Sequence, residues 1–560
     1  MLLRRSSGVR VARDSLVLNA RWRIAVTGAF LVAAAGLAGG CSSSQPGTAS
    51  CLSGAAPGRT PSAAAAPGWA LPGGNLQNTR DVASLITSAN VSKLGVAWCV
   101  PLAAAALFGD YATTPVVADG VVYTQDLLSN VIAIDLATGR VLWKHTYDSH
   151  NGGPDGVNVV HGIVYAATGS AAVALDAATG RQLWSRTLVG NVHEGIDMTP
   201  GYHGGTLYVS TVPVNATTGV SYGGDGQAVL WALNASTGAP QWSWDEVQNL
   251  WGLGINSGGG LWYAPSFDGQ GNIYLGVANP GPVGGLPGYP WGTSRPGPDL
   301  YTDSVVKLSP AGKLLWYYQL TPHDLFDWDL QDPPLLTIAN GQPVVIDGGK
   351  AGILVELNAQ TGTLIWKRPV GVHNGNDDDG VLTERATPAS HLALPAQITV
   401  EPGGFGGIET QLASNGSTTF AAVNDLPFTE RAESGPYFPS LQAFETAVTK
   451  GTGEMVAVNQ DTGKIQWDDH LPSSPYGAAT VTNNVVFTTT YNGYLYAFNA
   501  VTGAILLKLP LSAGTNAPVA IDGDYVITGA GIPKSNTQQP LIIAYKLGAN
   551  SKLPDTVSGL

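Results

Sequence analysis

A short phrase that repeats along the chain constrains its fold more than any other feature. It consists of an apolar residue, Asp or Asn, two variable residues, Thr-Gly, three further residues and Trp. Self-similarity of this kind is typical of proteins built from stacked structural repeats. The copies begin at Asp135, Asp176, Asn234, Asn358, Asn459 and Asn499, with a variant at Ser309, and the last copy ends at Leu507 instead of Trp.

Each copy predicts two strands joined by a tight hairpin. The alternating apolar residues before the Asp or Asn indicate a strand, and the Thr-Gly pair is typical of a turn in which glycine takes a positive φ. The following strand brings the Trp to the same place in each copy, where the flat indole can pack on the next sheet. Because a four-stranded sheet cannot bury both faces alone, we expect the sheets to stack radially into a closed β-propeller.

The spacing of the copies predicts the number of blades. Successive repeat glycines lie about 40 to 75 residues apart, except for one interval of about 100 residues. We expect that interval to hide a blade without the Thr-Gly turn, formed by residues 402–407 and the strand-like Thr418–Val423. Trp98 is expected in the strand that closes the ring. The fold class is therefore predicted as an all-β, eight-bladed propeller over residues 69–548, with a C-terminal tail over 549–560 and with seven blades as the alternative.

Composition agrees with this architecture and excludes one class of partner. Charged residues are 12% of the chain, and Gly (72), Pro (37) and Trp (15) are frequent, which favours an all-β repeat protein over a helical one. The formal net charge is −13, and no run of Lys or Arg follows the N-terminal segment. We therefore expect no nucleic-acid partner.

The N-terminal segment has the pattern of a targeting signal. Six arginines between residues 4 and 23 precede an apolar run over 24–38, which is too short to span a bilayer comfortably. Small residues then lead to Cys41, as in a bacterial lipobox, although Leu37 stands one place further from the cysteine than usual. We expect a signal peptide over 1–40, a lipidated Cys41 and a flexible tether over 41–68. This predicts an exported lipoprotein anchored on the extracytoplasmic face of the cell membrane, with a plain secretory signal and a secreted protein as the alternative.

The cysteines exclude two kinds of site. Only Cys51 and Cys99 follow Cys41, so a four-thiolate zinc site cannot form. No Cys-x-x-Cys-His phrase occurs, so no attached haem is expected. In an oxidising compartment Cys51 and Cys99 could pair, and two free thiols are the alternative.

Several blocks in the chain resemble a known enzyme family. They are Thr79–Trp98, Gly259–Trp262, Gly276–Pro280, Tyr318–Asp329 and Gly349–Gly352. Their order and spacing resemble those of pyrroloquinoline quinone (PQQ)-dependent alcohol dehydrogenases, whose superfamily also includes non-catalytic propellers. The resemblance runs from about residue 69 to about residue 548.

The resemblance implies a role for five residues. Trp262 would be the indole on which the flat quinone stacks, and Lys350 would be a cation near the quinone oxygens. Asn279, Asp327 and Asp329 would bind a metal ion through oxygen, which suits a hard cation. In relatives, a second acid at the place of Asp329 accompanies a lanthanide instead of calcium. Asp327 would also be the general base that takes the alcohol proton.

The family pattern is incomplete in the half of the site that grips the cofactor. The relatives' Glu metal ligand is absent from residues 219–226, where Asp225 is either a shorter substitute or a turn residue. Residues 151–156 lack the relatives' Arg, 112–115 lack an early Glu, and no Cys-Cys pair exists. Fewer cationic partners should weaken the binding of a tricarboxylate such as PQQ. His193, Glu194 and Asp197 either rebuild a pocket for another ligand or belong to a solvated loop.

The sequence is therefore consistent with two functions. The first, which we favour narrowly, is a PQQ- and metal-dependent dehydrogenase that oxidises an alcohol or related hydroxyl substrate and passes electrons to a separate acceptor. The second is a non-catalytic propeller that acts as an envelope scaffold or binding protein, with envelope proteins as partners. Under the second reading Trp262 is core packing, Asn279 a turn residue, Asp327 and Asp329 part of a solvated loop, and Lys350 a surface charge.

Overall fold

The computed structural model describes residues 68–554, except 105, 107, 152, 215–225, 249–253, 376–393, 437–440 and 536. The predicted signal peptide, Cys41, Cys51, nearly all of the predicted tether, and Asp225 lie outside the described residues. Among the residues that are described, no helix has the length and apolar character needed to cross a membrane.

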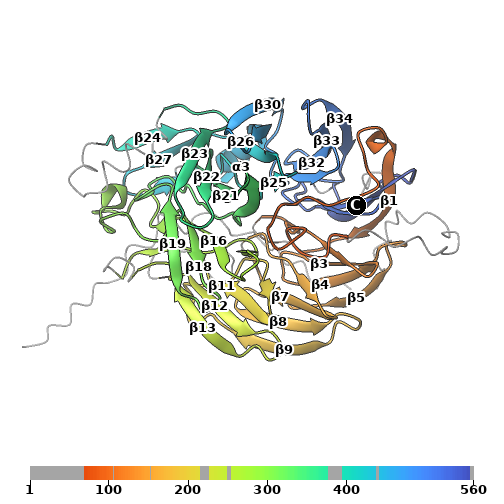
Figure 1. Ribbon diagram of the computed structural model, residues 1–560, viewed down its shortest axis with the longest axis horizontal. Coiled ribbons are helices and arrows are strands. Elements are labelled where there is room, and N and C mark those ends of the chain that lie inside the picture. Colours follow the sequence, from red (N-terminus) through yellow and green to blue (C-terminus); the bar gives the residue numbers. More distant parts are fainter. Residues whose placement is uncertain are drawn as a thin grey trace, which may run out of the picture.

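Eight four-stranded antiparallel sheets follow one another around a ring (Figure 1). The first four contain β2 (Val116–Ala118), β3 (Val121–Gln125), β4 (Val131–Asp135) and β5 (Val141–His145); β6 (Asn158–Val160), β7 (Ile163–Ala167), β8 (Ala171–Asp176) and β9 (Gln182–Thr187); β10 (Gly201–His203), β11 (Thr206–Ser210), β12 (Val229–Asn234) and β13 (Pro240–Asp245); and β15 (Ser266–Phe267), β16 (Ile273–Val277), β18 (Ser304–Leu308) and β19 (Leu314–Gln319).

The other four sheets complete the ring and confirm the prediction of eight blades. They contain β20 (Leu335–Ala339), β21 (Gln342–Gly348), β22 (Ile353–Asn358) and β23 (Leu364–Pro369); β25 (Ala413–Ser414), β26 (Thr418–Asp425), β29 (Thr452–Asn459) and β30 (Lys464–Leu471); β31 (Thr480–Thr482), β32 (Val485–Thr490), β33 (Tyr494–Asn499) and β34 (Ile505–Pro510); and β35 (Ala520–Asp522), β36 (Tyr525–Ala530), β37 (Leu541–Leu547) and β1 (Leu94–Pro101).

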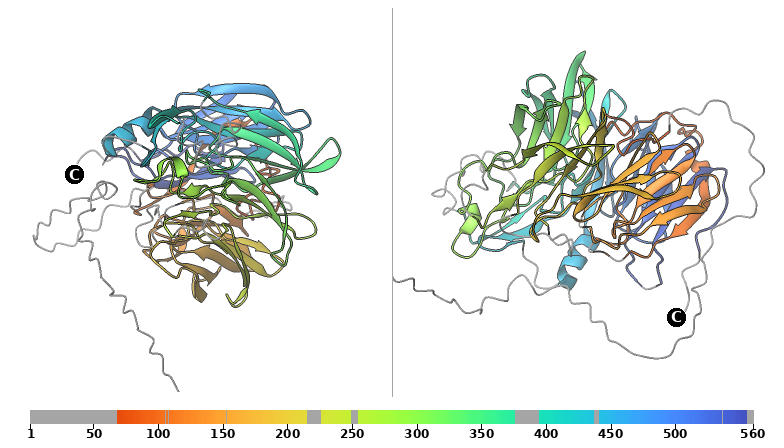
Figure 2. Two further views of the ribbon diagram at one scale, coloured as in Figure 1. Left: turned by 90° about the vertical axis from the view of Figure 1, so that its left-hand side faces the viewer. Right: turned by 90° about the horizontal axis from the view of Figure 1, so that it is seen from below.

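Within the described ranges, two smaller sheets and three short helices lie outside the blades. The smaller sheets pair β14 (Ser257–Gly258) with β17 (Pro280–Gly281), and β24 (Gln397–Val400) with β27 (Phe428–Arg431) and β28 (Gly435–Pro436). The helices are η1 (Val91–Lys93), η3 (Pro290–Gly292) and α3 (Leu441–Lys450). Helix α3 stands away from the ring on one face (Figure 2).

The eighth blade joins the two ends of the described chain, and the position of the degenerate blade was wrongly predicted. Strand β1 pairs with β37, placing Trp98 opposite Ala544 in the closing sheet, as expected. Strand β26, which was assigned to a separate blade, instead pairs directly with β29 from Thr418–Asn459 to Asp425–Thr452. The long interval is therefore lengthened by β24, which precedes β25, and by β27, β28 and α3, which lie between the paired strands β26 and β29.

The repeat phrase forms the contacts between blades. In one copy, the Asp135 side chain accepts hydrogen bonds from the backbone and hydroxyl of Thr138 at 2.9 and 2.7 Å, which closes the turn before Gly139. The Trp98 ring lies against Gly139, and its Nε1 donates to the Leu136 carbonyl at 2.8 Å. The same packing of one blade's Trp on the next blade's glycine recurs at Trp143–Gly180, Trp184–Gly238, Trp242–Gly312, Trp316–Gly362, Trp366–Gly463 and Trp467–Gly503.

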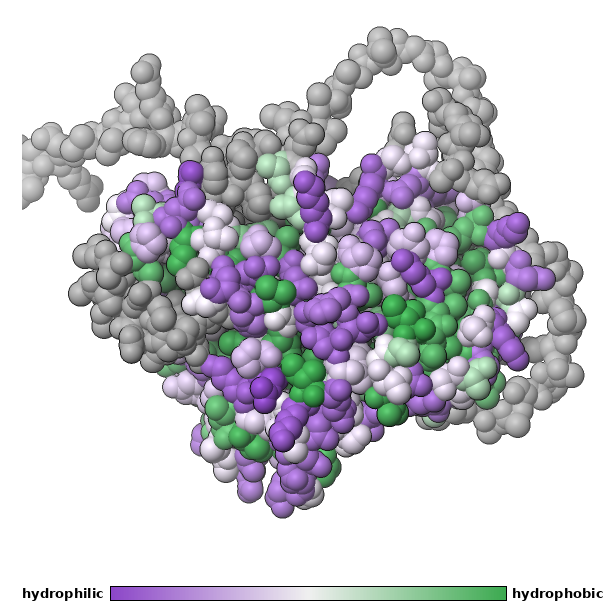
Figure 3. All heavy atoms as spheres, turned by 90° about the horizontal axis from the view of Figure 1, so that it is seen from above, coloured by the Kyte–Doolittle hydropathy of each residue, from purple (hydrophilic) through white to green (hydrophobic). Residues whose placement is uncertain are grey.

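The outer surface is mixed in character. On the face drawn in Figure 3, hydrophilic and hydrophobic residues lie in small interspersed groups. Part of the apolar exposure comes from the outermost strands of the blades, where Leu142, Leu183, Leu315, Ile365 and Ile465 are exposed. Cys99 in β1 is disulfide-bonded, so it is not a free thiol. Its pairing with Cys51 stays a prediction.

Candidate functional site

The segment between β19 and β20 presents two acids on a tightly held turn. The Asp324 carboxylate accepts hydrogen bonds from the backbone N–H groups of Phe326 and Trp328 at 2.9 and 2.8 Å. Asp327, inside this turn, has φ +63°, a left-handed conformation that is uncommon for residues other than glycine. Buried Trp328 donates from its indole to a backbone carbonyl at 3.0 Å. The turn therefore fixes the direction in which Asp327 and Asp329 leave the backbone.

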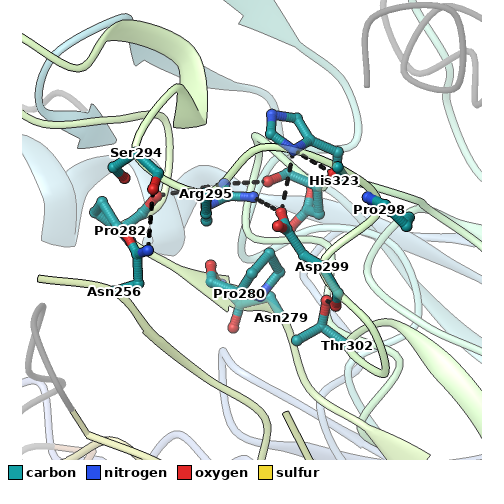
Figure 4. A network of polar contacts seen from close by, with 12 residues as sticks. Asn256, Asn279, Pro280, Pro282, Ser294, Arg295, Pro298, Asp299, Thr302 and His323 are labelled. Atoms are coloured by element: carbon teal, nitrogen blue, oxygen red, sulfur yellow. Dashed lines mark hydrogen bonds and ion pairs between the residues drawn. The ribbon is translucent and has the colours of Figure 1, made fainter. Parts of the chain in front are cut away.

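A buried network of charged side chains contacts this turn, and Figure 4 shows the residues around Arg295. The Arg295 guanidinium forms an ion pair with Asp299 and donates to the carbonyl oxygen of Asp324. His323 Nδ1 lies 3.1 Å from the Asp299 carboxylate and 2.8 Å from the Gly297 carbonyl oxygen. These side chains are fully or nearly fully buried, so they hold the segment in place from the interior. His323 lies in the block 318–329 that resembles the enzyme family, whereas no sequence motif pointed to Arg295 and Asp299, which lie in or next to a Pro- and Gly-rich stretch.

Lys350, which follows β21, lies at the centre of the predicted site. Its Nζ is 2.5 Å from Asp329 Oδ2 and 3.3 Å from Asp327 Oδ2. The same ammonium lies 4.9 Å from the centre of the Trp262 ring and 5.6 Å from that of Phe405. Burial opposes the charge of Lys350, but the two aspartates outweigh it and hold the pKa of the lysine well above its usual value. Lys350 is therefore a buried cation, and its assignment as a surface charge is wrong.

Asn279, at the end of β16, completes the group of five predicted residues. Its backbone N–H donates to Asp329 Oδ1 at 2.7 Å, and its side-chain Nδ2 donates to the Pro280 carbonyl at 3.2 Å. The Gly259 N–H donates to the Asn279 carbonyl oxygen at 3.1 Å, which ties the segment that carries Trp262 to the same place. The structure thus brings all five residues together from two neighbouring blades and the segments that lead into and between them.

Two further acids lie near this group, and burial dominates their titration. Burial raises the pKa of Glu409 to about 8, although Lys350 opposes this shift. Burial and the charge of Asp329 raise the pKa of Asp197 to about 7. For Asp327, burial raises the pKa and Lys350 lowers it, with a net rise. Asp197 is buried, so its interpretation as part of a solvated loop is wrong.

Glu409 had no recognisable signal in the sequence. It follows the glycine-rich stretch 402–407, whose only detected feature was a turn before a strand. The structure shows why the glycines are needed, because a Cβ at Gly407 would lie 2.1 Å from the Lys350 carbonyl oxygen and one at Gly404 would lie 2.8 Å from the Asp327 Cβ. The run of glycines over 402–407 was the one sign in the sequence that the backbone of this segment approaches other groups closely.

Acids also occupy the region around residues 151–156, which lacks the Arg that the family resemblance led us to expect. Asp155, in the segment 151–156, is completely buried, and burial together with Asp126 and Asp197 raises its pKa well above the usual value. Within the described residues, both Asp155 carboxylate oxygens, Asp197 Oδ1 and Glu409 Oε1 lack a hydrogen-bond partner. A buried carboxylate without a partner costs free energy unless a proton or a cation neutralises it.

This donor chemistry fits a hard metal ion and the reactive edge of a quinone. Carboxylate and amide oxygens are the ligands that calcium-like cations prefer, and the unpartnered buried oxygens are those that a cation would satisfy. The half-buried Trp262 ring and the Lys350 ammonium offer a flat surface and a positive charge to a planar anionic ring.

Comparison with known proteins relates most of the ring to alcohol dehydrogenases. A family model described as "Glucose/ethanol/alcohol dehydrogenase, beta-propeller domain" matches residues 69–402, and one described as "Outer membrane protein assembly factor BamB" matches 451–536. Quinohemoprotein alcohol dehydrogenase from Comamonas testosteroni is 28% identical over 532 residues, which cover 83% of this chain and 72% of that protein.

Solved structures share the fold. Quinohemoprotein alcohol dehydrogenase ADHIIG from Pseudomonas putida HK5 superposes with a TM-score of 0.75 at 21% identity, covering 88% of this chain and 82% of that one. A europium-containing methanol dehydrogenase superposes with a TM-score of 0.68 at 19% identity, covering 86% of this chain and 98% of that one.

Proposed function

The chain belongs to the glucose/ethanol/alcohol dehydrogenase family of β-propeller domains, and we propose that it is a PQQ- and metal-dependent dehydrogenase that oxidises an alcohol or related hydroxyl substrate outside the cytoplasm. The observation that carries the proposal is the contact of Lys350 with Asp327, Asp329 and Trp262 in one buried group. A non-catalytic ring has no need to bury an ammonium between two carboxylates beside an indole, because such burial costs desolvation energy.

The two aspartates differ in exposure, and this difference divides their roles. The Asp327 side chain is 22% exposed, whereas that of Asp329 is 3% exposed. Asp327 is therefore the acid that a substrate hydroxyl can reach, and it accepts the hydroxyl proton. Asp329, with Asn279, would hold the metal ion, and a cation of high charge would favour the ionised form of the nearby buried acids Asp197 and Glu409.

PQQ and its metal supply the electron-accepting carbonyl and the Lewis acid that polarises it. Trp262 would stack against the ring and set its plane. The Lys350 ammonium would stabilise negative charge that develops on the quinone oxygens. Asp324, Arg295 and Asp299 keep the base in position, since a misplacement of about 1 Å can cost a hundredfold in rate. The europium-containing relative makes a lanthanide a reasonable alternative to calcium for this acid-rich site.

Export and electron transfer complete the proposal. The N-terminal pattern supports an exported lipoprotein held at the membrane by Cys41, and the disulfide at Cys99 supports an oxidising compartment. Because the sequence contains no Cys-x-x-Cys-His phrase, electrons leave to a separate acceptor.

The second candidate, a non-catalytic envelope scaffold or binding protein, is favoured by two observations. The region that grips the cofactor in relatives carries the buried acid Asp155 and no Arg. Residues 451–536 match the BamB family model, which describes an outer membrane assembly factor. Envelope proteins would then be the partners.

Cofactor titration separates the two candidates. The full-length chain is titrated with PQQ in the presence of Ca²⁺ or La³⁺, and absorbance and dye-linked oxidation of an alcohol panel are recorded. We expect saturable binding, with turnover falling about 10²- to 10⁴-fold in Asp327→Asn and unchanged in Asp119→Asn, a matched substitution at an exposed turn. Absence of PQQ binding with either metal would favour the scaffold.

A further inference from the structure

Three metal-ligating side chains meet on one face of the blade β25–β26–β29–β30, away from the site described above. Asp425 ends β26, where it pairs with Thr452 of β29. Glu454 stands two residues further along β29 and pairs with His470 of β30. Because side chains two residues apart on a strand point to the same face, Asp425, Glu454 and His470 share one face across three adjacent strands. We name these three residues the rim cluster.

The ligand atoms of the rim cluster are already close together. The carboxylate oxygens of Asp425 and Glu454 and a ring nitrogen of His470 all lie within 4.8 Å of one another. His470 Nδ1 is 3.2 Å from Glu454 Oε1. The Glu454 side chain is 4% exposed, whereas that of His470 is 73% exposed. The Glu454 carboxylate is thus enclosed by its surroundings, whereas the exposed imidazole of His470 has room to adjust its position.

Backbone groups of the neighbouring blade orient the two acids. The Val372 N–H, just after β23, donates to Asp425 Oδ1 at 3.0 Å. The backbone of Gly371 donates to the Glu454 carboxylate. Gly371 has φ +79°, and a Cβ there would lie 3.2 Å from Asp425 Oδ1, so a side chain at this position would crowd the acid. The loop therefore leaves room for the cluster and holds its acids in position.

The rim cluster and its surroundings contain more acidic than basic side chains. Asp468, two residues before His470, lies on the same face and forms a side-chain hydrogen bond with Glu454. In the described parts of the chain, no lysine or arginine forms an ion pair with Asp425, Glu454 or Asp468. Two carboxylates this close together need a cation or a shared proton, and His470 is the imidazole that faces Glu454.

We propose that the rim cluster is a binding site for one divalent transition-metal ion, with Zn²⁺ as the best fit. Two carboxylates and one imidazole form a mixed oxygen and nitrogen ligand set that suits zinc, whereas an all-oxygen set suits calcium and magnesium. Three protein ligands leave a fourth position for water. Asp468, an exposed acid on the same face, is placed to accept a hydrogen bond from that water.

Metal binding here would strengthen the wall of the central site without taking part in its chemistry. Asn424, next to Asp425, exchanges two backbone hydrogen bonds of 2.8 Å with Gly407. Gly407 in turn lies against the backbone of Lys350. The inference does not rest on the proposed function, because the ligands are distinct from the acids around Lys350.

The test compares the removal of two imidazoles. The full-length chain is treated with a chelator, equilibrated with Zn²⁺ and passed through a gel-filtration column, and the retained zinc is measured by mass spectrometry. The expected result is one more zinc ion per chain in the parent than in His470→Ala, with at least tenfold weaker binding in the variant. His150→Ala, which removes an imidazole elsewhere, should retain the parent content.

Cobalt supplies a second readout. Co²⁺ bound by the cluster should give a visible absorption band that disappears in His470→Ala and in Glu454→Gln but persists in His150→Ala. Because His470 is exposed, its loss leaves the fold intact, which circular dichroism verifies. Equal zinc content and equal cobalt spectra in His470→Ala and His150→Ala would overturn the proposal.

Discussion

Replacement of Gly180 by alanine tests the contact on which the ring depends. Gly180 has φ +69°, and an added Cβ would lie 2.6 Å from Cε3 of Trp143. Gly162, in the same blade, has φ +75°, and an added Cβ there would meet nothing within 4 Å. The two substitutions therefore impose the same backbone strain, but only the first collides with an indole from the preceding blade.

The magnitudes follow from this difference. A left-handed alanine costs about 1–2 kcal/mol, and the lower entropy of its unfolded chain returns about 0.4–1 kcal/mol. Gly162→Ala should therefore lower the free energy of unfolding by about 1 kcal/mol. Gly180→Ala adds overpacking of about 1–3 kcal/mol. It also disturbs the hydrogen bond of 2.9 Å from Trp143 Nε1 to the Ala177 carbonyl, worth about 1 kcal/mol. The total should be about 3–5 kcal/mol.

Urea unfolding followed by tryptophan fluorescence and circular dichroism measures both variants under one set of conditions. In a Trp143→Ala background, the extra cost of Gly180→Ala should vanish and leave a value near that of Gly162→Ala, because the colliding ring is gone. Equal costs for the two glycine substitutions in the parent chain, or an undiminished difference in the Trp143→Ala background, would refute the reasoning.

Three further changes probe the site and the interior. An added Cβ at Gly404 would lie 2.8 Å from the Cβ of Asp327, so Gly404→Ala should lower turnover about a hundredfold with little change in the melting temperature. Gly190 has open space around it, and Gly190→Ala should leave turnover unchanged. Burial raises the pKa of Glu246 to about 8, so the folded chain keeps a proton that the unfolded chain loses above about pH 4.5. The free energy of unfolding therefore falls as the pH rises from about 4.5 to about 8. Glu246→Gln should flatten the decline in melting temperature over that range. Arg295→Met leaves a buried carboxylate without its ion-pair partner and should lower the urea unfolding free energy by about 3–5 kcal/mol.

The local repeat pattern was sufficient to predict the ring but not the route of the chain through it. Asp-x-x-Thr-Gly followed by Trp specifies a turn and an anchor within about ten residues, and these local rules hold in every sheet that carries them. The long interval before Asn459 was misread because a strand pattern does not say which strand it pairs with. Only the hydrogen bonds between Thr418–Asp425 and Thr452–Asn459 place both segments in one blade.

The candidate site divides in the same way. Trp262, Asn279, Asp327, Asp329 and Lys350 were predicted by resemblance to a family, and the structure brings them together. Their functional roles stay predictions. Glu409, Asp197 and Asp155 were not predicted as buried acids, because burial depends on segments that are distant in sequence.

The sequence by itself determined the strands, the turns and the indoles that join neighbouring blades, because these depend on residues within one hairpin and the next. Only the tertiary structure decided the pairing of β26 with β29, the excess of buried acids around Lys350 and the meeting of Asp425, Glu454 and His470. Those features depend on ring closure and strand register, which set the distances between residues far apart along the chain, and no local pattern encodes such distances.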